Sequence, residues 1–180
     1  MVNNREFIIP FVGLKEGIHE FIYNIDEKFF IERDFFEFSK ATTTVKLSLD
    51  KHSGFLMLKF EIGGNIELSC DRCGNPLPVD LWDEFNIVVK LVDNPEEMND
   101  QEEDPDIFYI SRLDSKIDIS TWIYEFILLS LPMQKVCKPD EKGNSTCNPE
   151  VLKKLQEMEI KNNEHNANTL WKGLDKFKDN

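Results

Sequence analysis

The feature that most limits the fold is a set of β-prone runs over residues 42–92. The runs TTTVKLSLD and FLMLKFEIGG are joined by the short segment KHSG, which is typical of a hairpin. Gly63 and Gly64 are expected to turn the chain again, so that NIELSC forms a third strand. A long fourth strand is predicted over 77–92, because apolar and polar positions alternate there, with Trp82 on the polar side. These runs predict an antiparallel meander.

Shorter elements are expected around these strands. Residues 6–38 predict one or two strands followed by an irregular or helical piece, and DIFYI at 106–110 predicts a further short strand. A helix is expected to open at CNPEVLKKLQEM, where Asn148 caps and Pro149 takes the first helical position. The tail at 167–177 predicts a last short helix.

The stretch DISTWIYEFILLSLP predicts a helix with Ser120 or Thr121 as its N-cap and Pro132 as its end. Its buried face is expected to hold apolar residues at i, i+4 and i+7, namely Trp122, Phe126 and Leu129. A chain of 180 residues suits one domain. We therefore predict a single α+β domain over 1–180, in which a β-rich part (1–119) forms an antiparallel meander or partly closed sheet and the helices of a C-terminal part (120–180) pack on it.

The charge of the chain is strongly acidic, with 34 Asp and Glu against 21 Lys and Arg and a formal net charge of -13. Such a surface repels phosphates, so direct binding of free nucleic acid is not expected. The segment at 93–106 supplies -8 of this charge and contains no basic residue. It predicts a solvated, mobile acidic loop, and the alternative is an arm that pairs with a basic partner. Its carboxylates belong to Asp93, Glu96, Glu97, Asp100, Glu102, Glu103, Asp104 and Asp106.

Neither a secretory signal nor a membrane span is expected. The N-terminal segment MVNNREFIIPFVGLKEG has no basic region before its apolar run, and Pro10 breaks that run. The longest apolar stretch, at 117–133, contains Asp118 and Glu125 and is shorter than the roughly 20 residues of a spanning helix. We therefore expect a cytoplasmic protein, whose cysteines are thiols or metal ligands rather than disulfides.

The four cysteines form two groups. Cys70 and Cys73 have the C-x2-C spacing of a zinc knuckle, and Gly74 follows them. Cys137 and Cys147 are separated by nine residues, which is more than a knuckle uses. One interpretation is a shared structural Zn(II) site, because four thiolates can surround the ion tetrahedrally. The other is that the first pair only forms a turn and that the second pair are unrelated small residues.

Enzymatic use of the cysteines has little support in the sequence. A redox C-x2-C pair opens a helix in a βαβ setting, whereas Pro76, Pro78 and a predicted strand follow this pair. The three histidines that might act as bases, His19, His52 and His165, are scattered along the chain. We predict that the protein is not an enzyme.

Several stretches resemble one family in the same order along the chain. They are CDRCGNPLPVDL, FILLSLPMQKVC, GNSTCNPEVLKKL and LWKGLDKF. Over roughly residues 6–178 the chain resembles the YceD family, the large ribosomal RNA subunit accumulation proteins, in the form common in Bacteroidetes-type bacteria. The resemblance matches the family's cysteine corner to Cys70 and Cys73 and its downstream site to Cys147, and it implies His in place of Cys137 in many relatives. Since Cys and His both ligate zinc, that exchange favours a metal over a disulfide.

The resemblance implies a non-enzymatic accessory role in ribosome biogenesis, supporting accumulation or processing of large-subunit ribosomal RNA. The acidic balance favours a basic partner, either a large-subunit ribosomal protein or a pre-ribosomal particle. A second hypothesis is direct binding of ribosomal RNA by a basic patch beside exposed aromatics, made of Arg72, Lys46, Lys51 and Lys59. A purely structural, zinc-stabilised interaction module is a further alternative, and a metal nuclease or thiol oxidoreductase ranks last.

Overall fold

The computed structural model describes residues 4–31, 33, 38 and 40–166. The chain forms two compact units. The first comprises Met1–Leu68 and Pro78–Met133, and the second comprises Ser69–Leu77 and Gln134–Asn180. The sheet therefore lies mainly in the first unit, while all four cysteines lie in the second.

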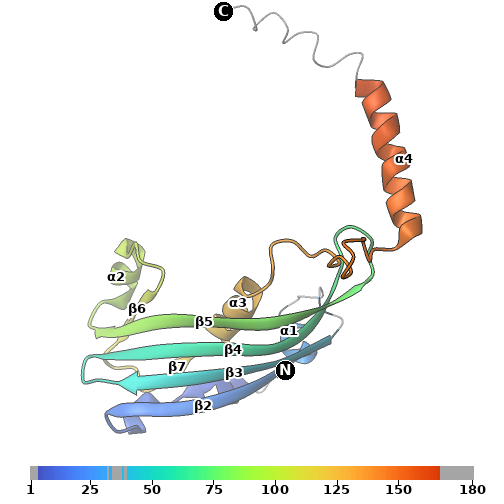
Figure 1. The fold of residues 1–180 in the computed structure, drawn as a ribbon. Coiled ribbons are helices and arrows are strands. Elements are labelled where there is room, and N and C mark those ends of the chain that lie inside the picture. The colour runs from blue at the N-terminus through green and yellow to red at the C-terminus, as the bar shows by residue number, and fades with distance from the viewer. Residues whose placement is uncertain (1–3, 32, 34–37, 39, 167–180) are drawn as a thin grey trace, which may run out of the picture. The chain divides into compact units, whose positions relative to one another are not determined.

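The first unit is built on a five-stranded sheet with the strand order β2-β3-β4-β5-β6 (Figure 1). The strands span Gly17–Asp26 (β2), Lys40–Lys51 (β3), Phe55–Ser69 (β4), Pro76–Val92 (β5) and Ile107–Ser111 (β6). β2 and β3 are antiparallel, as are β3 and β4, whereas β6 pairs with β5 in parallel. The predicted α+β class is confirmed, and the parallel edge strand makes the sheet a mixed one rather than a pure meander.

Shorter elements accompany the sheet. The helices span Glu27–Ile31 (α1), Pro95–Gln101 (α2), Ser120–Leu129 (α3) and Pro149–Asn166 (α4). Two 3-10 turns and a two-stranded antiparallel ribbon complete the described part, at Asn4–Phe7 (η1), Phe11–Gly13 (η2), Ile8–Ile9 (β1) and Ile117–Asp118 (β7). No helix within the described ranges is both long and apolar enough to cross a membrane.

One face of the sheet carries the core and packs against α3. Phe126 of α3 stacks on Phe85 of β5 with ring centroids 4.4 Å apart, and meets Phe60 of β4 edge-on at 5.1 Å. Trp122, one turn earlier, contacts the same Phe60 ring. The alternation predicted for 77–92 is confirmed, since Leu81 and its alternate neighbours on β5 face this core. Burial of each large side chain stabilises the fold by roughly 2 kcal/mol.

The turn predicted at Gly63 and Gly64 is wrong, because β4 runs through both residues as one strand. Gly63 pairs with Thr44 and Gly64 with Thr43, in an uninterrupted register with β3. Gly64 has φ 144°, and a Cβ at this position would lie 2.7 Å from Thr43 Cα and collide with the Thr42 carbonyl oxygen. The glycine therefore permits close approach of two backbones rather than a change of direction.

The helix predicted after residue 118 exists, but two of its details differ. Its N-cap position is Ile119 rather than Ser120 or Thr121, and the Ser120 N–H donates to Asp118 Oδ1 at 2.9 Å. Trp122 and Phe126 are buried as predicted, whereas Leu129 is 67% exposed. Leu129 is the last residue of α3, so no further helical turn covers it.

The helix predicted at CNPEVLKKLQEM is confirmed as α4. Pro149 is its first residue, and Asn148 Oδ1 accepts a hydrogen bond from the Glu150 N–H at 3.0 Å. The Asn148 carbonyl oxygen accepts from the Leu152 N–H at 3.1 Å, as the residue before a helix does. The short helix predicted at 167–177 lies outside the described residues.

Candidate metal centre

The first cysteine pair lies on a tight corner directly after β4. The Gly74 N–H donates to the Cys70 carbonyl oxygen at 2.8 Å, and the Cys70 N–H donates to the Asn75 carbonyl oxygen at 2.9 Å. Gly74 adopts φ 72°, a left-handed conformation that side chains other than glycine disfavour. The trailing glycine is therefore a backbone requirement of the corner that presents Cys70 and Cys73.

The segment that brings Cys137 is fastened to this corner by Asp71. The Asp71 N–H donates to the Lys135 carbonyl oxygen at 2.6 Å, and Asp71 Oδ2 accepts from the Lys135 N–H at 3.1 Å. These two bonds join residues 64 positions apart in the sequence. They place Cys137, two residues after Lys135, beside the C-x2-C corner.

The nine residues between Cys137 and Cys147 fold back on themselves. Asp140 organises this turn, because its Oδ1 accepts from the Lys142 N–H at 2.9 Å and from the Asn144 N–H at 2.7 Å. Thr146 Oγ1 donates to the Lys138 carbonyl oxygen at 2.7 Å across the base of the loop. The wide spacing of the second pair is thus compatible with one site.

The four sulfur atoms come together in the second unit. The Sγ atoms of all four cysteines lie within 4.8 Å of one another. Cys70 Sγ is 3.9 Å from Cys147 Sγ, and Cys73 Sγ is 3.8 Å from Cys137 Sγ. Tetrahedral Zn(II) with bonds of about 2.3 Å to sulfur requires sulfur atoms about 3.8 Å apart. The four cysteines are free thiols rather than disulfides, and their arrangement fits a closed four-thiolate metal site.

The pKa values of two thiols in the cluster are shifted in opposite directions. Burial raises the pKa of Cys70, but hydrogen bonds from the backbone amides of Arg72, Cys73 and Cys137 outweigh it and lower the pKa to about 6. The pKa of Cys137 is raised to about 12, first by its hydrogen bond to Cys70 and then by burial and the other cysteines. One thiolate is therefore favoured in the cluster, while further negative charge is opposed unless a cation balances it.

Two of the histidines, His19 and His52, make polar contacts away from the cysteines. His19 Nε2 is 2.8 Å from the Lys15 carbonyl oxygen, and His52 Nε2 is 3.0 Å from Asp50 Oδ2. The potential metal ligands that come together within the described ranges are thus the four cysteines.

The predicted acidic loop contains a folded element, α2. The side-chain amide of Asn99 makes two hydrogen bonds to the backbone of Tyr109 in β6, as a neighbouring strand would. Its Nδ2 donates to the Tyr109 carbonyl oxygen and its Oδ1 accepts from the Tyr109 N–H, both at 2.9 Å. The Tyr109 hydroxyl donates to Glu102 Oε2 at 2.6 Å. This bond lowers the pKa of Glu102, so the carboxyl group is ionised at neutral pH. Within the predicted mobile loop, Pro95–Gln101 is thus a helix hydrogen-bonded to β6, and binding of a partner by the carboxylates of the segment stays a prediction.

Two of the four basic residues considered for RNA binding, Lys51 and Lys59, have partners within the chain. Lys51 Nζ donates to the carbonyl oxygens of Phe11 and Leu14 at 2.9 and 2.7 Å. Lys59 Nζ pairs with Glu61 and Glu84, while Arg72 belongs to the second unit. Among these four side chains, Lys46 is the one on the sheet for which no acceptor within hydrogen-bond distance is identified.

Sequence reasoning found the four ligand candidates but missed the residues that assemble them. Asp71 and Asp140 position the second pair by accepting backbone N–H groups, and neither was singled out. The signal for Asp140 is present in DEKGN, because Asp followed by Gly three residues later is typical of a side-chain-stabilised turn.

Comparison with known proteins identifies a family for this chain. No curated protein and no solved structure matches the chain. Residues 58–178, more than half of the chain, match the family described as large ribosomal RNA subunit accumulation protein YceD. The matched range contains the whole cysteine corner, the Cys137–Cys147 loop and α3. On this evidence the chain belongs to the YceD family.

Proposed function

We propose that this chain is a non-enzymatic accessory protein of ribosome biogenesis. It supports accumulation and processing of large-subunit ribosomal RNA through a basic partner, either a ribosomal protein or a pre-ribosomal particle, and acts in the cytoplasm. Membership of the YceD family is the observation that carries this proposal. The formal charge of -13 supports a basic protein partner over bare RNA, because carboxylates repel phosphates and attract Lys and Arg.

Within this proposal the four cysteines hold a structural Zn(II) ion. Four thiolates fill the tetrahedral shell and leave no position for a water or a substrate, which is the arrangement of structural rather than catalytic zinc. The sulfur separations of 3.8 and 3.9 Å support this assignment. The ion would hold the Cys70–Cys73 corner, the segment around Cys137 and the start of α4 together.

The acidic segment is proposed to attract the basic partner. Its carboxylates are carried by α2 and the residues around it, and α2 is fixed by Asn99 to β6. The electric field of carboxylates on a fixed helix points in one direction, whereas the field of carboxylates on a mobile chain averages over many directions. Attraction between exposed charges weakens as ionic strength rises, since the Debye length falls from about 10 Å at 0.1 M to about 3 Å at 1 M.

A deletion strain tests the role. Loss of the protein should lower the ratio of large- to small-subunit ribosomal RNA and raise precursor forms of the former, and the wild-type gene should restore both. Pulldown of the tagged protein at low and moderate salt, with RNA and proteins identified, names the partner. A strain with unchanged ribosomal RNA and precursor levels would refute the role.

A charge variant tests the acidic segment separately. Changing all eight carboxylates of 93–106 to amides should reduce recovery of the basic partner at low salt. A matched variant controls for net charge with amides at eight exposed carboxylates elsewhere, namely Glu6, Glu16, Asp114, Glu125, Glu141, Glu150, Glu157 and Glu159. Equal recovery by all three proteins would show that the segment is only a solvated helix.

A further inference from the structure

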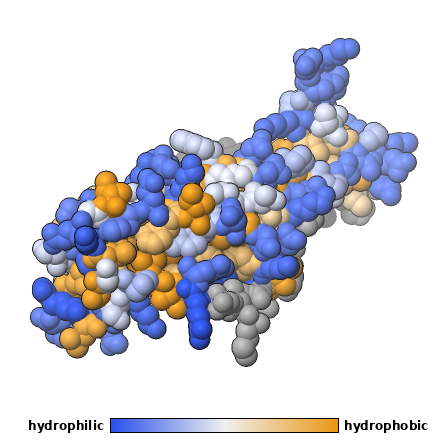
Figure 2. Space-filling model, turned by 90° about the horizontal axis from the view of Figure 1, so that it is seen from below, coloured by the Kyte–Doolittle hydropathy of each residue, from blue (hydrophilic) through white to orange (hydrophobic). Residues whose placement is uncertain are grey.

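The outer face of the sheet exposes apolar side chains on β5 and on β2. Trp82 on β5 is 81% exposed and Ile22 on β2 is 65% exposed, although both lie within regular strands. Seen from below in Figure 2, the surface of the molecule shows orange hydrophobic side chains among blue hydrophilic ones. An exposed tryptophan on a rigid strand is a frequent anchor of protein interfaces.

Trp82 borders an open depression of about 350 Å³. Gly63 and Gly64 of β4 line the depression with Thr44 and Glu61. Gly64 cannot accept a side chain, because its Cβ would meet the backbone of β3. Strand pairing therefore keeps Gly64 without a side chain, and the space that a Cβ on Gly63 would enter is open, so the depression leaves the indole accessible to a planar group.

A second depression continues the first toward β2. It has a volume of about 390 Å³ and is lined by Ile22 and Glu20, among others, and it shares Lys46 and Glu61 with the first. Trp82 and Ile22 are three strand spacings apart, or about 14 Å. That distance is about four residues of extended chain, so a short segment can reach both apolar positions.

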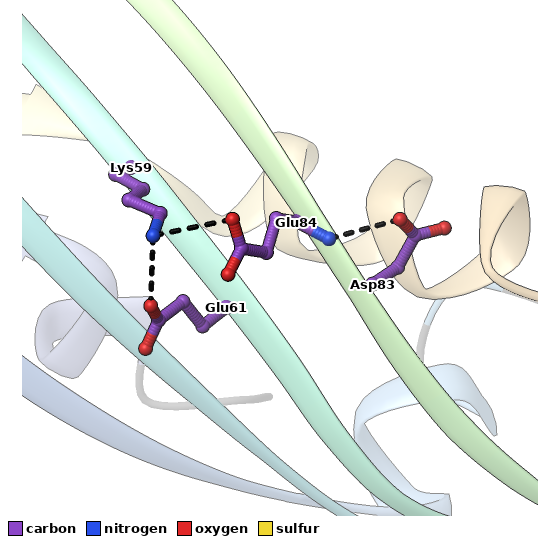
Figure 3. A network of polar contacts seen from close by, with 4 residues as sticks. All are labelled: Lys59, Glu61, Asp83 and Glu84. Atoms are coloured by element: carbon purple, nitrogen blue, oxygen red, sulfur yellow. Dashed lines mark hydrogen bonds and ion pairs between the residues drawn. The ribbon is translucent and has the colours of Figure 1, made fainter.

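The two depressions form one strip on the outer face of the sheet, from Trp82 to Ile22. The charges of this strip favour a cationic partner. Three carboxylates line the two depressions against two ammonium groups: Glu84, Glu61 and Glu20 against Lys46 and Lys59. Figure 3 shows Lys59 between Glu61 and Glu84, with its Nζ 2.9 and 3.2 Å from their oxygen atoms. That ammonium group is already neutralised, and its hydrogen bond lowers the pKa of Glu61, which is therefore ionised at neutral pH. Phosphates would meet a net negative surface.

We propose that this strip, from Trp82 to Ile22, binds a short arginine-bearing segment of the basic partner. The guanidinium group lies over the Trp82 indole and pairs with Glu61 and Glu84, and an aliphatic side chain about four residues away contacts Ile22. The inference rests on the proposed function for the identity of the partner. The chemistry of the strip itself depends only on the sheet.

A defined peptide tests the strip directly. The probe is a fluorescent Gly/Ser peptide of about ten residues that carries two adjacent arginines and a leucine about four residues on. Fluorescence anisotropy at low salt should show saturable binding to the full chain. Replacement of the arginines by neutral citrulline should abolish it, and replacement by lysine should weaken it, because an ammonium group lacks the planar fork.

Variants of the chain locate the binding. Trp82→Ala should weaken binding about fivefold to tenfold and Trp82→Phe less, because cation–π contacts at partly exposed sites contribute about 1 kcal/mol. The double variant Glu61→Gln, Glu84→Gln should weaken it about tenfold, since it removes both carboxylates facing the guanidinium. Leu113→Ala and Glu125→Gln, both exposed at other places, should bind as wild type.

Three results would overturn the inference. They are no binding of the arginine peptide, binding that is unaffected by Trp82→Ala, and tighter Trp82-dependent binding of a single-stranded oligouridine RNA. The deletion strain separates this inference from the proposed function. If wild type restores ribosomal RNA and Trp82→Ala restores it equally, the strip is not the docking site although the role holds. If wild type restores nothing, the role itself fails, whatever the peptide does.

Discussion

Removal of one metal ligand should unfold the second unit while leaving the first intact. Among the residues of the second unit whose burial is described, up to Ile160, Cys70 and Cys147 are the buried ones, so this part of the unit has no apolar core of its own. Ordering the backbone of the nine residues between Cys137 and Cys147 costs roughly 10 kcal/mol or more. The hydrogen bonds of Asp140 and Thr146 return only about 1 kcal/mol each. Ligation of the proposed zinc ion, on the order of 10 kcal/mol, is large enough to offset this cost.

The assay combines metal content with local hydrogen exchange. Wild-type protein should contain one zinc ion per chain by elemental mass spectrometry, and Cys70→Ser should contain much less. Amides of residues 134–148 should lose protection in Cys70→Ser and in chelator-treated wild type, whereas those of β3 and β4 should keep theirs. Lys138→Ala, an exposed change in the same loop, is the matched control.

The opposite result would refute the reasoning. If residues 134–148 of the metal-free protein exchange as slowly as in the untreated protein, the corner is held by its hydrogen bonds. The wide Cys137–Cys147 loop would then be stable without ligation, and the cysteines would be small buried residues that happen to lie close together.

Three further outcomes are expected. Gly64→Ala should lower the free energy of unfolding by at least 1–3 kcal/mol in denaturant titrations, because of the positive φ and the backbone collision, whereas Gly63→Ala, with open space around it, should cost little. Burial, and then the charge of Glu6, raises the pKa of Tyr23 from 10.0 to about 12. Between these two pH values, native Tyr23 therefore retains a proton that the unfolded chain has lost. About 3 kcal/mol of stability should therefore disappear between pH 10 and 12, and Tyr23→Phe should flatten this decline. Asn99→Ala should speed hydrogen exchange in α2 and at Tyr109, because two paired bonds of about 1 kcal/mol each are lost, whereas Asn94→Ala should not; equal exchange in both variants would contradict the role of the Asn99 amide.

Local alternation was sufficient to predict the hairpin of β3 and β4 and the long strand β5. In 77–92 the apolar residues recur every second position, so both the strand and the exposure of Trp82 follow from the pattern. The pair Gly63-Gly64 was misread, because two glycines usually signal a turn. Their role depends on the close approach of Thr42 in the neighbouring strand, and no local pattern contains that information.

The acidic segment shows a second limit of sequence reasoning. Its composition is that of a mobile loop, yet a single amide side chain, Asn99, supplies the two hydrogen bonds that attach α2 to β6. The parallel pairing of β6 with β5 was missed for a related reason, since it requires a connection that crosses from one end of the sheet to the other. Only tertiary contacts decide between these alternatives.

The cysteines were identified from their spacing, but their convergence was not decided by it. A nine-residue interval permits both a shared site and two unrelated residues. Asp71 and Asp140 bring the two pairs together, because their carboxylates accept hydrogen bonds from backbone amides and fix the path of the chain. Such polar side chains determine how a loop folds, but they produce no hydrophobic periodicity from which the fold of the loop could be predicted.

The division of the second unit into two separate stretches of sequence has a consequence for its synthesis. Cys70 and Cys73 leave the ribosome long before Cys137 and Cys147, and the whole segment Pro78–Met133 is made in between. A chain that lacks the later pair has only two thiolates and cannot complete a tetrahedral shell. Closing so long a loop also carries an entropic cost, which prior folding of the sheet would reduce. For the proposed zinc site, metal uptake is therefore expected to be the last step of maturation and to mark a chain whose translation has passed Cys147.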